Sequence, residues 1–305
     1  MKVAVVQAAT VVYDTTATLK KLDSLAREAA EAGAKLILFP EAFVGGYPEG
    51  ADFGCKSLEF PTDAQRDEYK DYFKASIEEH GPESKKMEEL AVSLRIYMVV
   101  GVIERGGSTL YCAVFFYSPT GYLGKHRKVV PTYLERIVWG QGDGSTMSVF
   151  ETELGKLGCT ICHENYMPLF RVNMYSKGVQ IYLAPAMTDH ETWATLMRAI
   201  ALEGRCFVLS TSQYLKTSDY PSGHRIIKER GEDKPVVTGG CCIIDPLGNF
   251  LVEPDHSGET IRYAEIDVEQ TVRGKFDLDT VGHYSRPDIF KLVVDEKPLP
   301  GVVRL

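Results

Sequence analysis

The sequence has no long apolar run and no broadly basic region. No stretch approaches the roughly 20 apolar residues that a membrane-spanning helix needs, so we expect no membrane partner. The 305 residues carry 34 Lys and Arg against 42 Asp and Glu, and the two signs are interspersed. A net charge of -8 in this arrangement does not suggest a nucleic-acid-binding face. Apolar residues make up 44%, which is enough for a large core and excludes a disordered or fibrous protein.

The sequence also lacks the cysteine pattern of a disulfide scaffold. Its seven cysteines are an odd number, are widely scattered, and occur in a chain too large to need disulfide bonds. The first residues form a brief apolar run that soon reaches Asp14 and has no small-residue cleavage site, so we expect no signal peptide. These features predict a reducing, cytoplasmic location.

What the sequence does have is the stretch "CTICHENYMP", from Cys159 to Pro168. Its first five residues match the attachment signature of c-type haem, and its first four match a dithiol redox site. A zinc site is a further possibility. Alternatively, Cys162 is a nucleophile followed at once by His163 and Glu164, which are candidate acid or base groups.

Two of these interpretations, haem and zinc, have little support elsewhere in the chain. Covalent haem attachment normally occurs in exported proteins, and nothing here predicts export. A structural zinc needs about four ligands, usually in two close pairs. Cys241 and Cys242 form the other tight pair, but adjacent strand residues point to opposite faces. We therefore expect no metal or organic cofactor.

Apolar runs typical of strands alternate with amphipathic helical patterns along most of the chain. This order predicts an α/β fold whose continuous apolar strands are covered on both faces. We expect strands over 3–9, 34–41, 96–104, 110–119, 122–129, 157–162, 179–186, 206–213, 239–246, 249–254 and 259–267, and helices over 18–33, 83–95, 168–178 and 191–204.

Several reactive side chains follow these strands. Cys162 ends the run "LGCTIC", at the carboxyl end of a strand, where ligands bind in open α/β sheets. Cys159 lies three residues earlier, so we expect it on the opposite face of that strand. Glu41 closes "LILFPE" among apolar neighbours, and burial would raise its pKa towards that of a general base. Lys128 lies in a basic cluster and Glu135 precedes a Gly-rich turn; alone, each would be interpreted as a surface residue.

Together, five segments resemble the nitrilase branch of the carbon-nitrogen hydrolase family, in particular the nitrilases of plant and bacterial type. They are "FPEAFVGGYP", "GKHRKVVPTYLERIVWGQGDGS", "GCTICHENYMPLFR", "YLAPA" and "VGHYSRPD". The resemblance covers nearly the whole chain in unbroken order. It implies an α/β fold of the four-layer α-β-β-α sandwich type, with subunits that pair through outer helices and often extend into spirals.

By this resemblance, Glu41 corresponds to the general base, Lys128 to the catalytic lysine and Cys162 to the nucleophile. Glu135 matches the second glutamate, which holds the lysine and the cysteine in place. One position departs from the branch, because His163 stands where Trp usually follows the nucleophile. We expect substrate contacts from Tyr47, Tyr133, His163, Glu164, Asn165 and Met187.

The implied activity is hydrolysis of an organic nitrile by water to a carboxylic acid and ammonia, through thioimidate and thioester intermediates, with possible minor release of amide. An amidase or carbamoyl hydrolase of the same superfamily, using the same four residues, is the alternative. We expect one domain over residues 1–281, and a tail over 282–305 at a subunit interface. The apolar residues of this tail predict a homo-oligomer, a dimer or larger and possibly a spiral.

Overall fold

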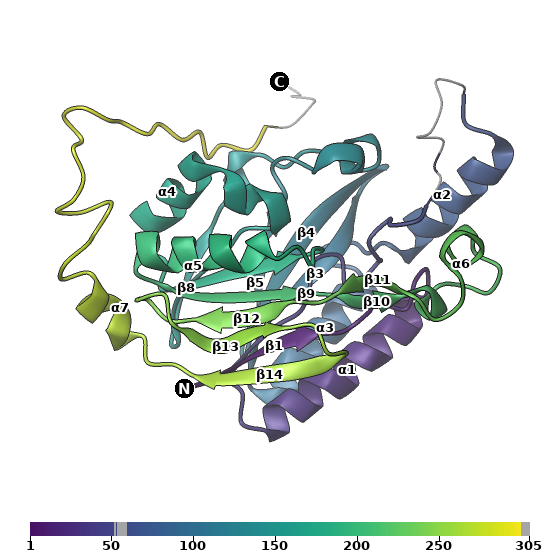
Figure 1. Cartoon of the computed structure of the whole chain (residues 1–305). Coiled ribbons are helices and arrows are strands. Elements are labelled where there is room, and N and C mark those ends of the chain that lie inside the picture. The colour runs from purple at the N-terminus through teal and green to yellow at the C-terminus, as the bar shows by residue number, and fades with distance from the viewer. Residues whose placement is uncertain (52, 54–59, 300–305) are drawn as a thin grey trace.

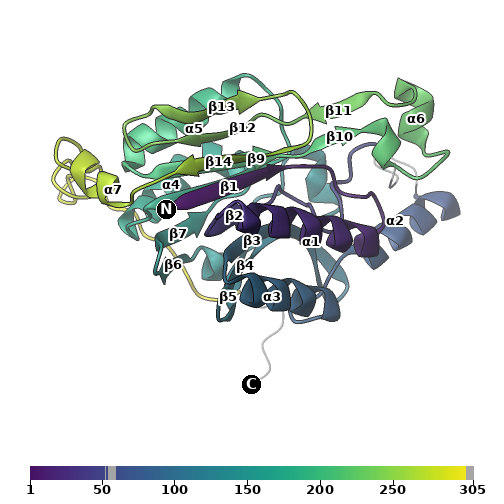
Figure 2. The ribbon, with the colours of Figure 1, turned by 90° about the horizontal axis from the view of Figure 1, so that it is seen from below.

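Two six-stranded sheets lie face to face, and helices cover the outer face of each (Figure 1). The computed structural model describes residues 1–51, 53 and 60–299. Figure 2 shows α1 (Thr15–Glu31) and α3 (Pro82–Leu94) on the outer face of the first sheet. On the other side, α4 (Pro168–Ser176) and α5 (Thr192–Gly204) cover the second sheet. The predicted four-layer α-β-β-α sandwich is therefore confirmed.

The first sheet has the strand order β14-β1-β2-β3-β4-β5. Its central strands β1, β2 and β3 are parallel, and the remaining pairs are antiparallel. The bounds are β1 (Lys2–Gln7), β2 (Leu36–Leu38), β3 (Tyr97–Gly106), β4 (Thr109–Ser118), β5 (Gly121–Arg127) and β14 (Thr260–Glu265).

The second sheet has the order β13-β12-β9-β8-β7-β6, again with three parallel strands, β7, β8 and β9, in its middle. The bounds are β6 (Val149–Thr152), β7 (Gly155–Cys159), β8 (Ile181–Ala186), β9 (Phe207–Ser212), β12 (Cys241–Ile244) and β13 (Phe250–Asp255). A separate hairpin pairs β10 (Tyr214–Lys216) with β11 (Pro235–Thr238).

Alternation along the strands explains why they are apolar at every position. In β1, Val3 and Val5 pack into the core between the sheets, whereas Ala4 and Val6 pack against the outer helices. Successive strand residues point to opposite faces, so a strand covered on both faces needs apolar residues throughout. Both faces of the central strands are thus hydrophobic cores.

Most predicted elements are present, with shifted ends. The helix predicted from residue 18 begins at Thr15, because Asp14 caps it by accepting a hydrogen bond from the Ala17 N–H at 2.8 Å. The sequence pattern did not predict the helices α2 (Asp63–Ala75), α6 (Arg225–Arg230) and α7 (Glu269–Gly274) or the short strands β6, β10 and β11. One-turn 3₁₀ helices occur at η1 (Tyr133–Ile137), η2 (Gly144–Thr146), η3 (Cys162–Tyr166) and η4 (Thr217–Asp219).

After α7 the chain runs over the outside of the molecule without further helices or strands as far as residue 299 (Figure 1). It returns to the body near Asp143, whose carboxylate accepts a hydrogen bond from the Leu299 N–H at 2.8 Å. Residues 300–305 of the predicted tail lie outside the described residues. Within the described part, no helix is both long and apolar enough to span a membrane.

Candidate active site

Glu41, Lys128 and Glu135 are joined in one buried ion-pair cluster. The ammonium Nζ of Lys128 lies 2.6 Å from Oε1 of Glu41 and 2.8 Å from Oε2 of Glu135. All three side chains are almost completely inaccessible to solvent. Cys162 is buried beside them, and the charges of all three act on its thiol. The structure therefore brings together the four residues that the sequence predicted to be catalytic.

The sheets supply these residues from strand ends. Glu41 follows β2, Lys128 directly follows β5, and Cys162 lies three residues after β7. Because β5 is antiparallel to β4, which is antiparallel to β3, it runs in the same direction as β2 and β3. Each residue is thus at a carboxyl end of its sheet, the edge where open α/β sheets bind ligands.

Three residues at this edge have left-handed backbone conformations. Cys162 has a φ of 50°, Ala42 has 51° and Tyr133 has 48°. Positive φ is unfavourable for residues other than glycine and persists where the surrounding structure enforces it, which occurs often at functional sites. Ala42 directly follows Glu41, Tyr133 begins the turn η1 that carries Glu135, and Cys162 begins η3, so the three left-handed residues lie at the members of the cluster.

Two glycines allow the backbone around the site to pack closely. A Cβ at Gly101 in β3 would lie 2.0 Å from the carbonyl oxygen of Pro40 and 2.7 Å from Cα of Glu41. A Cβ at Gly142 would lie 2.5 Å from the carbonyl oxygen of Arg127, next to the Lys128 carbonyl that accepts from the Gly142 N–H at 2.8 Å. The Gly-rich turn therefore holds the backbone of the lysine.

Burial and the ion pairs determine the protonation of Lys128 and Glu41. Burial opposes the charge of Lys128, but the Glu41 carboxylate and the other acidic groups nearby raise its pKa well above the ordinary value. For Glu41, burial raises the pKa, and the Lys128 ammonium offsets only part of that rise. Oε2 of Glu41 is buried and has no hydrogen-bond partner among the described residues. A cationic donor therefore lies beside a carboxylate that can accept a proton.

The Cys162 thiol has a raised pKa as well. Burial is the main cause and the Glu41 charge adds to it, while Lys128 and a hydrogen bond from the backbone N–H of Met187 lower the pKa. The thiol is therefore protonated at neutral pH and needs a base before it can act as a nucleophile. Met187 directly follows β8, and its backbone N–H supports its expected place beside the reacting atoms.

Tyr47 contacts Glu135 from the opposite side to Lys128. Its hydroxyl donates to Oε1 of Glu135 at 2.6 Å, and its ring packs edge-on against Trp139 with centroids 5.5 Å apart. Burial, together with the Glu135 charge, raises the pKa of Tyr47, so its hydroxyl stays a donor. Glu135 is buried, so a surface position for this residue, as its local sequence indicates, is wrong.

A pocket of about 390 Å³ opens above Tyr47 and Glu135, and Tyr133 lies in its wall. The Tyr133 side chain is 79% exposed, which leaves its ring accessible from the pocket mouth. Arg225 lines the same pocket, where its guanidinium donates to the Gly50 carbonyl oxygen at 2.6 Å. Tyr47 and Tyr133 therefore occupy positions that a substrate entering this pocket could touch.

His163 lies at the edge of the site. Its Nδ1 is 3.6 Å from the Cys162 sulfur, and its ring packs against Tyr166 with centroids 5.2 Å apart. The His163 side chain is exposed to solvent, yet the protein atoms around the ring and the nearby Lys128 ammonium lower its pKa. His163 is therefore a neutral, exposed neighbour of the thiol.

Glu164 and Asn165, expected to contact substrate, make different contacts. Both are buried. The Glu164 carboxylate accepts from the backbone N–H groups of Val129 and Ile161, and the Asn165 amide donates to the Cys162 carbonyl oxygen at 2.8 Å. These contacts hold the backbone and favour a positioning role over the expected contact with substrate.

The predicted strand position of Cys162 requires a correction. Strand β7 ends at Cys159, and Cys162 begins the 3₁₀ helix η3 instead of continuing the strand. Cys159 is a buried free thiol in the core between the two sheets. The two cysteines are therefore separated by a turn and do not lie on opposite faces of one strand. Within the described residues, no group of three or more His, Cys, Asp or Glu is placed to hold a metal ion.

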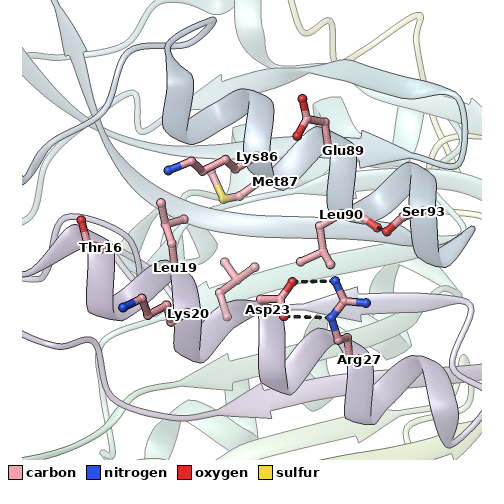
Figure 3. A pocket seen from close by; sticks show the side chains of 11 residues that line it. Thr16, Leu19, Lys20, Asp23, Arg27, Lys86, Met87, Glu89, Leu90 and Ser93 are labelled. Atoms are coloured by element: carbon pink, nitrogen blue, oxygen red, sulfur yellow. Dashed lines mark hydrogen bonds and ion pairs between the residues drawn. The ribbon is translucent and has the colours of Figure 1, made fainter.

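A larger hollow lies elsewhere on the molecule. A groove of about 540 Å³ lies between α1 and α3. Figure 3 shows Leu19, Met87 and Leu90 in it and the Asp23–Arg27 ion pair at one side. This groove belongs to the outer helices and not to the strand ends. The buried charges and the thiol at the strand ends therefore identify the candidate active site, although a larger groove lies elsewhere.

Four further residues contribute to the site and were not predicted. The Cys112 thiol lies 3.4 Å from Oε1 of Glu41, and the Gln213 amide donates to the Glu41 carbonyl oxygen at 2.9 Å. Lys128 Nζ lies 5.7 Å from the Trp139 ring, within the "WGQGDGS" motif. His126, in the basic cluster, contacts Glu164 at 2.9 Å. Its position two residues before Lys128 was the available signal, since alternate residues share a face.

Comparisons with known proteins agree with this architecture. The chain is 49% identical over 304 residues to an aliphatic nitrilase of Sinorhizobium fredii, covering 99% of this chain and 98% of that protein. It is also 49% identical to a bifunctional nitrilase/nitrile hydratase of Lupinus angustifolius, covering 98% of this chain and 87% of that protein.

Among solved structures, a carbon-nitrogen hydrolase from Helicobacter pylori shares the fold, with a TM-score of 0.71 at 20% identity over 94% of this chain and 97% of that one. Residues 2–275 match the family described as carbon-nitrogen hydrolase. The sandwich and its buried Glu, Lys, Glu and Cys cluster thus accompany a family match over nearly the whole sequence, and the chain belongs to the carbon-nitrogen hydrolase family.

Proposed function

We propose that this protein is a nitrilase that converts an organic nitrile and two waters into a carboxylic acid and ammonia. Cys162 is the nucleophile, Glu41 the general base, and Lys128 the group that stabilises charge on the nitrile nitrogen. Glu135 holds Lys128. The relatives named as nitrilases, at 49% identity over nearly the full chain, support this activity.

The reaction begins with a protonated thiol. Glu41 takes the proton from Cys162 on Oε2, the oxygen that is unpartnered among the described residues, while Oε1 stays bonded to Lys128. This transfer moves one negative charge from the carboxylate to the sulfur and leaves the total charge of the buried cluster unchanged. The raised pKa of Glu41 makes the exchange easier, because the base and the acid are closer in proton affinity.

The thiolate then attacks the nitrile carbon, and a carbon–sulfur bond forms as one carbon–nitrogen π bond breaks. The nitrogen gains negative charge beside the Lys128 ammonium and receives the proton held by Glu41, which gives a thioimidate. A fixed ammonium in a buried site stabilises charge that appears mainly in the transition state. The ion pairs with Glu41 and Glu135 keep Lys128 cationic for this step.

Two waters complete the reaction. Glu41 activates the first water, which adds to the thioimidate carbon, and loss of ammonia leaves a thioester. The second water cleaves the carbon–sulfur bond, releases the carboxylic acid and restores the thiol. If the tetrahedral intermediate expels the thiol before ammonia, the product is an amide. The bifunctional name of the Lupinus relative is a reason to measure both products.

The observation that carries this proposal is the buried Cys162 thiol within the charges of Glu41, Lys128 and Glu135. The test compares Cys162→Ala with Cys159→Ser on a panel of aliphatic, aryl and arylacetonitrile substrates, with ammonia, acid and amide all quantified. Cys162→Ala should abolish turnover, and Cys159→Ser should keep most of it. Turnover by a folded Cys162→Ala protein would contradict the proposal, and release of ammonia from amides but not from nitriles would favour the amidase alternative.

We propose that the protein acts as a homo-oligomer, either a dimer or a larger assembly such as a spiral. Large apolar side chains just after α7 and in the tail are open to solvent in the single chain: Phe276 and Val293 are each 90% exposed and Phe290 is 77% exposed. Leu169 on the outer helix α4 is also exposed, and exposed apolar side chains of this kind mark surfaces that bind other proteins. Light scattering tests this proposal, and a fully active 33.9 kDa species at micromolar concentration would contradict it.

We also propose that the enzyme works in the cytoplasm. Its described cysteines, Cys162 included, are free thiols, and the proposed nucleophile must stay reduced. Cell fractionation with an antibody against the protein would test this location.

A further inference from the structure

One buried carboxylate joins the segments that carry Lys128 and Cys162. Oε1 of Glu164 accepts from the backbone N–H of Val129 at 2.6 Å, and Oε2 accepts from the backbone N–H of Ile161 at 2.7 Å. Val129 follows Lys128 directly, and Ile161 immediately precedes Cys162. The first segment extends from the first sheet and the second from the second sheet. Glu164 therefore bridges the two halves of the sandwich at the site.

His126 holds this carboxylate from β5. Its Nε2 lies 2.9 Å from Oε2 of Glu164, and its Nδ1 lies 3.1 Å from the carbonyl oxygen of Thr146. The two ring nitrogens thus each face an oxygen, and the ring is held between Glu164 and Thr146, the last residue of η2. The ring also packs edge-on against Phe170 of α4, with centroids 5.5 Å apart. Both polar ends of the imidazole are thus engaged in a buried environment.

We infer that Glu164 and His126 are positioning residues that set the distance and angle between the Lys128 ammonium and the Cys162 sulfur. The inference rests on the proposed function, and it assigns neither residue a contact with substrate. A nitrile must meet the sulfur at carbon and the ammonium at nitrogen in the same transition state, so the relative placement of these two groups controls the rate. Glu164 accepts from the backbone N–H groups of Val129, next to Lys128, and of Ile161, next to Cys162, so any shift of Glu164 moves both of these segments.

The geometry predicts what a neutral isostere would do. In Glu164→Gln, one of the two carboxylate oxygens becomes an NH₂ group. Whichever way the amide is turned, that NH₂ faces a backbone N–H, either of Val129 or of Ile161, and one hydrogen bond is lost. One of the two segments is then released, although the side chain keeps its size.

Steady-state kinetics on one good nitrile substrate provide the test. We expect Glu164→Gln to lower kcat by about 10²-fold, the scale for a misplacement near 1 Å, with KM changed by less than about threefold. KM should hold because the neutral nitrile gains its interaction with Lys128 mainly in the transition state. The matched control is Tyr117→Phe, which removes a buried 2.9 Å hydrogen bond to Ser84 in the outer core and should leave kcat unchanged.

A conservative rescue tests the His126 contact separately. His126→Gln can still donate to Oε2 of Glu164 from its side-chain amide, whereas His126→Ala cannot, so the Gln variant should retain at least about fivefold more kcat. This pair decides the question if Glu164→Gln does not fold. A folded Glu164→Gln protein with wild-type kcat, or equal kcat in the two His126 variants, would overturn the inference. Turnover by Cys162→Ala would instead refute the proposed function, so the two failures are distinguishable.

Discussion

Replacing Lys128 by Met removes one positive charge from a cluster that holds two carboxylates. Nζ of Lys128 contacts Glu41 at 2.6 Å and Glu135 at 2.8 Å, with all three groups buried. Removing one partner of a buried ion pair typically destabilises a protein by ~3–5 kcal/mol, because it leaves a buried charge without compensation. Losing a donor to the transition state should also lower kcat by about 10²–10³-fold.

The pH dependence identifies the cause of the lost stability. A carboxyl group whose pKa is higher in the folded state than in the unfolded state makes the free energy of unfolding fall as pH rises between those two values. Burial already raises the pKa of Glu41, and Lys128 lowers it, so loss of Lys128 raises that pKa further. The deficit of Lys128→Met relative to wild type should therefore grow as pH rises above the wild-type pKa of Glu41. This stability deficit should grow by up to about 1.4 kcal/mol per pH unit for each proton involved.

Urea unfolding at one fixed protein concentration measures this deficit for wild type, Lys128→Met, Glu41→Gln and the double variant. The double variant lacks the uncompensated negative charge of Glu41, so its free energy of unfolding should be about 1–3 kcal/mol higher than that of Lys128→Met at pH 7. Urea unfolding measures stability and not turnover, so the loss of activity that we expect in each variant does not affect this result. Additive losses, or a deficit that does not change with pH, would refute the reasoning.

Three further changes probe the surroundings of this cluster. Gly101→Ala should abolish most activity and lower the urea midpoint, because its Cβ would meet the backbone of Pro40 at 2.0 Å and displace Glu41; wild-type values of both would contradict the packing argument. Tyr47→Phe should reduce kcat/KM roughly tenfold, equal to ~1.4 kcal/mol, because Oε1 of Glu135 loses its 2.6 Å hydrogen-bond donor. An unchanged kcat/KM would show that this hydrogen bond is dispensable. His163→Trp should change the relative kcat/KM values of small aliphatic, aryl and arylacetonitrile substrates by several-fold, the ~1–3 kcal/mol scale of pocket contacts, without loss of activity. If kcat/KM changes by one common factor for all three substrates, His163 does not select substrate.

The apolar strands predicted an α/β fold with sheets covered on both faces, and the family resemblance implied the four-layer sandwich. That pattern is visible in runs such as 34–41, where Leu36 and Leu38 face the core between the sheets and Ile37 faces the outer helices. By contrast, α2 was missed because it buries only Tyr72 and Ala75 and has no continuous apolar stripe. Its capping box, in which Thr62 and Gln65 bond each other's backbone N–H, was the available signal.

Turns were harder to predict than strands. The run "LGCTIC" is apolar to its end, so nothing in its composition shows that the strand stops at Cys159. The turn has a positive φ at Cys162, which is unfavourable for that residue. It is held by the Asn165 amide bonded to the Cys162 carbonyl and by the remote Val129 N–H bonded to Glu164. Local preference therefore pointed away from the conformation that the site requires.

The basic cluster "KHRK" shows how two-residue alternation separates structural from catalytic charges. On one side of the chain, Lys125 and Arg127 both contact the buried carboxylate of Glu104, at 2.5 and 2.7 Å. These pairs lie between β3 and β5 and fasten the edge of the first sheet. Their charges are satisfied within the protein, which agrees with the absence of a broadly basic region in the sequence.

On the other side, His126 and Lys128 point towards the second sheet. His126 contacts Glu164 and Lys128 contacts Glu41, so each inward side chain has its own carboxylate partner. A solvated basic turn, the interpretation favoured by this short stretch alone, would need no such partners. Because the partners come from segments remote in sequence, local composition could not distinguish the two cases. The alternation itself could have done so, since it places His126 on the same face as Lys128 and thereby links the proposed positioning residue to the proposed catalytic one.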